Sequence, residues 1–260
     1  MIISDEKNFV FIHIPKCGGT EIKSSLKKYD SYAGLYDGRI DVLGTEKVDF
    51  THLPLKDIKK NFPELFNKIL DFKSYTIVRD PIKRFSSGIN QYVKFQYGRG
   101  IHDFSSKEIK KIIDSIILKL EHKENRLDPS LIYFEPQVSF IYVDGAKVIN
   151  NIFSIHQMGN LKKVIQDNHD IFFESMGSRP KNSSLEYRAH FIRFVTRFIP
   201  TNLRELIRKT FPFWLMDLIR KLVFKKASSL PANSIQTIES FVNDFYKDDI
   251  SLYQEVINNE

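Results

Sequence analysis

The segment Phe9–Thr20, FVFIHIPKCGGT, constrains the fold of this chain more than any other. Its first six residues are mostly apolar β-formers, the composition of a strand buried on both faces of a parallel sheet. Gly18 and Gly19 allow a tight turn in which the backbone can approach a ligand closely. The N–H groups of that turn and the ammonium of Lys16 would then face one point. The segment predicts an anion-binding loop between a buried strand and a helix.

The order of residues in this loop separates it from the common nucleotide-triphosphate loop, in which the lysine follows the last glycine. Here the lysine precedes both glycines, and residues 21–29 predict the helix that follows. The order resembles the 5′-phosphosulfate loop of sulfotransferases that use 3′-phosphoadenosine 5′-phosphosulfate (PAPS), particularly the carbohydrate-modifying branch. The resemblance implies that the donor is bound by Lys16, Cys17, Gly18, Gly19 and Thr20.

A second motif follows another predicted strand, residues 74–78, and reads RDPIKRFSS. Asp80 is placed to cap a helix that has a proline in its first turn. Arg79 would lie at the carboxyl end of the strand, where open α/β sheets bind ligands, and Arg84 and Ser87 would share one helix face. The spacing matches the R-D-P-x-x-R-x-x-S motif of the same family. The resemblance implies that Arg79 and Ser87 grip the 3′-phosphate of PAPS.

His52 is the candidate general base of the reaction. It follows a short predicted strand in residues 48–55, VDFTHLPL. Transfer of a sulfuryl group to a hydroxyl needs a group that takes the proton near neutral pH, and histidine titrates in that range. A histidine in the corresponding segment is the proposed base of related carbohydrate sulfotransferases. The structural alternative for His52 is a hydrogen bond within its loop, and His13, inside the first strand, is predicted to be packed.

We expect Lys16 to have a catalytic role in addition to its role in donor binding, because negative charge develops near it during the reaction. The negative charge that grows on the bridging oxygen would be stabilised by its ammonium and by the loop N–H groups. Cys17 has no activating base motif, so we expect it to pack rather than to attack. The sequence offers no clustered Cys, His and Asp pattern, and we expect no metal.

The length of 260 residues fits one α/β domain. We expect a three-layer, P-loop-like fold with a central parallel sheet flanked by helices. The single cysteine indicates a reducing compartment. The sequence contains no run of about 18 uncharged apolar residues, so we expect neither a signal peptide nor a membrane span. Together these features lead us to expect a cytoplasmic protein. Further predicted segments are a helix over 107–120, a turn and strand over 130–143, an amphipathic helix within 156–165, a polar loop over 179–184 and a closing helix over 235–256.

Residues 188–226 depart from the resemblance. They hold ten Lys and Arg residues against two acidic ones, so the whole basic excess of the chain, a net charge of +7, is located there. Apolar residues recur at helical spacing in runs that Pro200 and Pro212 interrupt, which predicts two or three short amphipathic helices, a helical basic insertion in the single domain. Such helices bind an anionic membrane surface or an acidic glycan, or else they cap the core with their cations in water.

Three classes of function remain open at this point. The first is a sulfotransferase that acts on a carbohydrate, free, acidic or lipid-linked, at the inner face of the membrane. The second is a P-loop-like kinase or other nucleotide-binding enzyme, whose lysine should follow the glycines. The third is a non-enzymatic binder of polyanions or membranes, which would not need Arg79 and Ser87 at phosphate-gripping spacing. No motif that reads nucleic acid occurs, so we expect no nucleic-acid partner.

Overall fold

The computed structural model describes residues 1–37, 40–43, 46–122, 129–173, 185–187, 224–226 and 230–259. The chain divides into two compact units, one of residues 1–179 with 230–260 and one of residues 180–229. In the second unit, β9 (Leu185–Tyr187) pairs antiparallel with β10 (Phe224–Lys226). The predicted polar loop 179–184 and the predicted helices of 188–226, up to the start of β10, lie outside the described residues. Of the helices that are described, none is both long and apolar enough to cross a membrane.

The first unit is built on a four-stranded sheet in the order β1-β2-β5-β8. The strands β2 (Phe9–Ile12), β5 (Lys73–Val78) and β8 (Asn151–Ser154) are parallel, as predicted. The edge strand β1 (Ile2–Ser4) is antiparallel to β2, so the expectation of an all-parallel sheet is wrong at this edge. Only residues 5–8 connect the two, and a parallel connection needs about a dozen residues or more.

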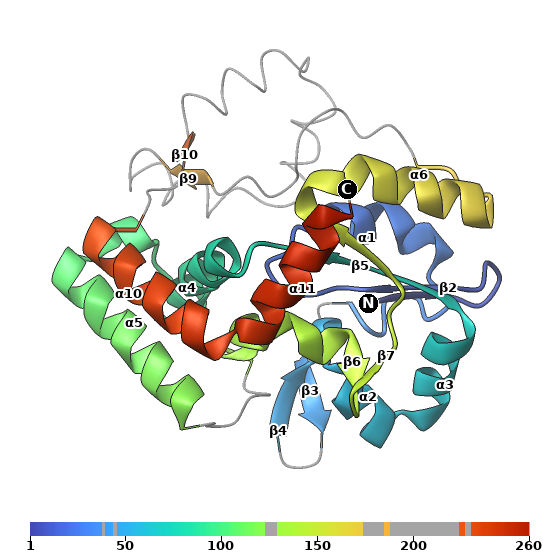
Figure 1. Ribbon diagram of the computed structural model, residues 1–260, viewed down its shortest axis with the longest axis horizontal. Helices are drawn as coiled ribbons and strands as arrows, with labels where there is room; N and C mark the ends of the chain where they lie inside the picture. Colours follow the sequence, from blue (N-terminus) through green and yellow to red (C-terminus); the bar gives the residue numbers. More distant parts are fainter. Residues whose placement is uncertain are drawn as a thin grey trace, which may run out of the picture. The chain divides into compact units, whose positions relative to one another are not determined.

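Helices flank this sheet on both sides, so the chain is α/β as expected (Figure 1). In this view α1 (Thr20–Leu26) and α6 (Met158–His169) lie on one side, and α2 (Leu55–Asn61) and α3 (Pro63–Asp71) lie on the other. The helix predicted from Glu21 ends in a 3₁₀ turn, and the amphipathic helix predicted within 156–165 is α6. A mixed, parallel-rich sheet with helical layers results, and its P-loop-like layering stays a prediction.

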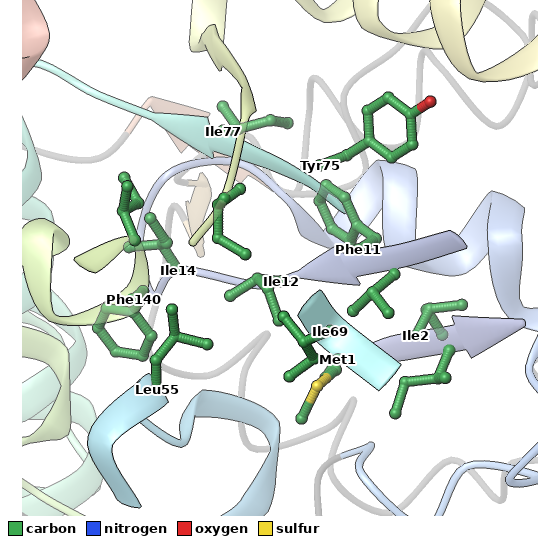
Figure 2. Close-up of a cluster of buried hydrophobic side chains, with 14 of the residues drawn as sticks. Met1, Ile2, Phe11, Ile12, Ile14, Leu55, Ile69, Tyr75, Ile77 and Phe140 are labelled. Carbon is green, nitrogen blue, oxygen red and sulfur yellow. The ribbon is translucent and has the colours of Figure 1, made fainter. Parts of the chain in front are cut away.

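The sheet is held by an apolar core. All four residues of β2 are buried, as the continuous apolar run predicts for a central strand. In Figure 2, Phe11 of β2 lies beside Tyr75 of β5, and Leu55 of α2 points toward Ile14 and Phe140. Each such side chain contributes about 1.5–3 kcal/mol when it is fully removed from water. This core fixes the carboxyl ends of β2 and β5 next to each other.

A second apolar cluster joins α4 (Pro81–Tyr97), α5 (Ser106–Glu121) and α10 (Ala232–Phe245). The prediction of a helix over 107–120 is confirmed by α5. Ser105 and Glu108 form a reciprocal capping box at its start. The buried stripe of α5 consists of Ile109, Ile112, Ile113, Ile116 and Leu120.

Two sequence predictions are wrong in detail. In residues 130–143 only β6 (Tyr142–Val143) is a strand, and it pairs with β7 (Ala146–Lys147). The closing helix is two helices, α10 and α11 (Lys247–Asn258), because the backbone leaves helical geometry at Tyr246. Within the described residues, the remaining elements are a hairpin of β3 (Ile40–Leu43) and β4 (Glu46–Asp49) and six 3₁₀ turns, η1 (Lys27–Tyr29), η2 (Phe50–His52), η3 (Ile101–Asp103), η4 (Ile132–Phe134), η5 (Gln137–Phe140) and η6 (Ile155–Gln157).

Candidate functional site

The loop between β2 and α1 has a backbone that needs its glycines. Lys16 and Gly18 have positive φ angles of 65° and 84°. A Cβ atom on Gly18 would lie 2.9 Å from the side chain of Ile155. A Cβ atom on Gly19 would lie 2.5 Å from the ring of His13, although the φ of Gly19 is ordinary. The first glycine is therefore required for its conformation and the second for its close packing.

The second motif meets this loop directly. Arg79 follows the last residue of β5, at the same sheet edge as the end of β2. Its Nη1 donates a hydrogen bond to the backbone carbonyl of Lys16 at 3.1 Å. Both side chains are half-buried. The structure thus brings together the two segments that the sequence assigned to the two ends of one nucleotide.

Helix α4 begins as predicted and places Ser87 on the same side as Arg84. Asp80 accepts a hydrogen bond from the backbone N–H of Lys83 at 2.8 Å, as the N-cap of a helix that starts at Pro81. Ser87 is half-buried, whereas Arg84 is only 2 % exposed.

The guanidinium of Arg84 serves the protein interior rather than a ligand. It donates from Nε to the carbonyl of Pro15 at 3.0 Å and from Nη2 to that of Glu135 at 2.6 Å. Its Nη1 lies 3.9 Å from the carboxylate of Asp249, which is 1 % exposed. Of the two arginines in the motif, Arg84 is committed to the interior, whereas Arg79 is half-buried.

The ammonium of Lys16 lies in a cationic and partly dry environment. Its Nζ donates to Oε1 of Gln91 on α4 at 3.2 Å. Burial, followed by the nearby charges of Lys94 and Arg79, lowers the pKa of Lys16 to about 8. Among the residues that the structure describes, no carboxylate forms an ion pair with Lys16. An anion placed here would restore the pKa of Lys16 toward its ordinary value.

His52 lies in the 3₁₀ turn η2, just beyond the strand β4 where the sequence placed it. Its Nδ1 is 2.9 Å from the carbonyl oxygen of His13, and the two rings are 4.7 Å apart. A carbonyl only accepts, so Nδ1 carries the hydrogen and Nε2 is the acceptor nitrogen. Burial lowers the pKa of His52 to about 4, which keeps the ring neutral at pH 7. The hydrogen bond that was the structural alternative for His52 is therefore present. It fixes the tautomer in which Nε2 can accept a proton.

Cys17 is buried, and its Sγ contacts Oε1 of Gln137 at 3.2 Å. Burial raises the pKa of this thiol to about 11, so the sulfur is a protonated packing group at neutral pH. The geometry agrees with the expectation that Cys17 does not attack. No group of three or more metal-ligating side chains occurs within the described part of the chain.

Residues 1–128 match the model of the sulfotransferase family. Over this range, just under half of the chain, the sequence is similar to the sulfotransferase family. The match contains the loop of Lys16, the turn of His52 and the motif from Arg79 to Ser87. Comparison of the chain with curated proteins and with solved structures gives no match. The match indicates a transferase, and members of the matched family generally use PAPS as the sulfuryl donor.

Three residues of this sulfotransferase site were not predicted from the sequence. Gln91 contacts the ammonium of Lys16, Gln137 contacts Arg79 and Cys17, and Asp249 contacts Arg84. The Pro136-Gln137 pair resembles a family segment, and Asp249 lies within the Y-x-x-D-x-x-x-Y pattern near the C-terminus, so both carried a signal. Gln91 carried none, because its partner lies 75 residues away in the sequence.

Proposed function

We propose that this protein transfers a sulfuryl group from PAPS to a hydroxyl group of a carbohydrate. The observation that carries the proposal is the contact of Arg79 with the backbone of Lys16 at the ends of β5 and β2. A donor with phosphates on both sides of its ribose needs two anion-binding groups at a fixed spacing. The chain offers them on two adjacent strand ends.

The residues present fit the two ends of this donor. Arg79 and Ser87 would bind the 3′-phosphate, with a guanidinium and a hydroxyl that are not used up by buried partners. The N–H groups of Gly18, Gly19 and Thr20 and the ammonium of Lys16 would bind the 5′ side, where close approach needs the absence of Cβ atoms. Bound PAPS supplies an activated sulfuryl group with a good leaving phosphate.

The side chains then divide the chemistry between them. Nε2 of His52 takes the proton from the acceptor hydroxyl as its oxygen bonds to sulfur. Lys16 stabilises the negative charge that appears on the bridging oxygen as the bond from that oxygen to sulfur breaks. Both groups have the required protonation state at pH 7, because Lys16 is charged below a pKa of about 8 and His52 is neutral above a pKa of about 4.

The acceptor and the cellular site are proposals that rest on the sequence. The loop of Lys16 resembles that of the carbohydrate-modifying branch, which favours a polysaccharide or glycolipid hydroxyl. The cations of residues 188–226 would hold an acidic or lipid-linked acceptor, with the protein at the inner face of the membrane. The single cysteine favours a reducing compartment such as the cytoplasm.

Release of adenosine 3′,5′-bisphosphate from PAPS in the presence of candidate glycans tests this function. Lys16→Ala should abolish release with a small change in melting temperature, because the side chain is half-buried and only one hydrogen bond is lost. His52→Ala should lower the rate about 100-fold or more while the donor still binds. Equal turnover in the Lys16 variant would remove this residue from the mechanism, and a parallel loss of donor affinity in the His52 variant would make that residue structural.

A further inference from the structure

The peptide group of Arg79 lies just past the hydrogen-bonded part of the sheet. The pairing of β5 with β8 ends at Val78, and that with β2 ends at Thr76. The N–H and C=O groups of Arg79 therefore have no strand partner, and polar backbone groups this close to the core need one.

A side chain takes the place of the missing strand. Gln137 is completely buried, and its amide accepts from the N–H of Arg79 at 2.9 Å and donates to the C=O of Arg79 at 2.9 Å. This reciprocal pair reproduces the two hydrogen bonds that one residue exchanges with a neighbouring strand. The same Oε1 atom also receives the thiol of Cys17 in the phosphate loop at 3.2 Å. One amide thus joins both donor-binding segments.

The backbone of Gln137 is itself anchored. Its N–H and that of Val138 donate to the two carboxylate oxygens of Asp249, at 2.9 and 3.0 Å. Asp249 lies in the first turn of α11 and is 1 % exposed. The position of the amide is therefore set by a rigid helix that comes from the other end of the chain.

We propose that Gln137 is a positioning residue for donor binding, which holds Arg79 and the phosphate loop at the spacing that a doubly phosphorylated adenosine requires. The inference rests on the proposed function and deepens it. Gln137 acts through Arg79 and the loop and does not touch the donor. Its loss should weaken binding of a nucleotide that uses both segments more than binding of one that uses the loop alone.

The test compares adenosine 3′,5′-bisphosphate with adenosine 5′-monophosphate by calorimetry on the full chain. Gln137→Met keeps the size of the side chain and removes both hydrogen bonds to Arg79. We expect the bisphosphate to lose about tenfold in affinity and the monophosphate much less. The matched control is Tyr75→Phe, which removes a buried hydrogen bond to His169 from the same strand, away from the site. It should lower the melting temperature similarly and leave the ratio of the two affinities unchanged.

A second variant separates positioning from packing. In Gln137→Glu the ionised form of the introduced carboxyl cannot donate to Arg79, whereas its protonated form has one donor and one acceptor, like the amide. The charged and titratable groups near it are Arg79, Cys17, Arg84 and Asp249. Relative to the original protein at each pH, the affinity for the bisphosphate should recover as the pH is lowered from 7.5 to about 5.5.

The outcomes distinguish this inference from the proposed function. If the original protein itself does not prefer the bisphosphate, the proposed function fails. If it does, and the Gln137→Met protein keeps the same preference, Gln137 is not a positioning residue. A Gln137→Glu protein that stays folded but shows no recovery at low pH also contradicts the inference.

Discussion

At the scale of single residues, the candidate site depends on Lys16, whose charged form is destabilised by its surroundings. Lys16 has a hydrogen bond to Gln91 but shares its surroundings with Lys94 and Arg79. A free ammonium in such a place is costly, and an incoming anion removes part of that cost. The proposed binding of phosphate groups would therefore be coupled to the protonation of Lys16.

This coupling predicts how kcat/KM for the donor changes on the basic limb of its pH profile. The group is charged below its pKa, so kcat/KM for the donor should fall as the pH rises through about 8. Lys94→Gln removes a neighbouring like charge, which should move this limb to higher pH. Lys110→Gln, on an exposed lysine of α5 that pairs with Asp114, is the control and should leave it in place. A limb that does not move in the Lys94 variant would mean that another group controls it.

Most residues of the candidate site are readable from the sequence and three are not, for a physical reason. The loop of Lys16 and the motif at Arg79 are local, because a strand end, a turn and a helix start all leave their mark on adjacent residues. Gln91 and Gln137 act across long sequence separations, and no local pattern predicts which groups their amides contact. Only the assembled sheet shows that Gln137 completes the hydrogen bonding of β5.

At the scale of elements, the strand–loop–helix unit of β2 and α1 determines how closely a ligand can approach. Its strand was predictable from a run of apolar residues that ends at a proline. The 3₁₀ turn η5 was not, because the N–H groups of Gln137 and Val138 bond to Asp249 instead of to a neighbouring strand. The break at Tyr246 likewise depends on a distant partner, the carbonyl of Phe134, to which its hydroxyl donates.

Gly19→Ala tests the packing of this unit. The new methyl group would lie 2.5 Å from the ring of His13, so the loop must move away from the strand. Donor affinity should fall about tenfold or more, measured with adenosine 3′,5′-bisphosphate. Gly159→Ala on α6, where a Cβ atom meets nothing within 4 Å, is the control and should raise stability by about 0.5–1 kcal/mol. Unchanged donor affinity in the Gly19 variant would show that the loop adjusts without cost.

At the scale of the first unit as a whole, a buried polar junction formed by Asp249 and Arg84 connects the helix α11 to the loop after β2. Asp249 binds two backbone N–H groups of η5 and faces Arg84, which binds the backbone of Pro15 before the phosphate loop. Its contacts cross from α11 to the loop after β2, far apart in the sequence. The family match covers only residues 1–128, yet the site is held in place by residues beyond it.

Removal of the Asp249 carboxylate should therefore destabilise the whole unit rather than one helix. Asp249→Ala leaves Arg84 and two N–H groups without their partner, which should cost about 3 kcal/mol in the free energy of unfolding. Asp248→Ala, at the exposed neighbouring position in the same first turn, should change it by about 0.5 kcal/mol or less. Denaturant unfolding of both variants gives the comparison. Equal small losses would show that the junction does not stabilise the fold.

The central claim is that one nucleotide with phosphates at both its 3′ and 5′ positions spans Arg79 and Lys16. Calorimetric titration with adenosine 3′,5′-bisphosphate and with ATP, on the original protein and on Arg79→Ala, tests it most directly. The account predicts that the original protein strongly prefers the bisphosphate and that Arg79→Ala loses most of this preference. Equal binding of the two nucleotides, or a preference for ATP, would contradict it.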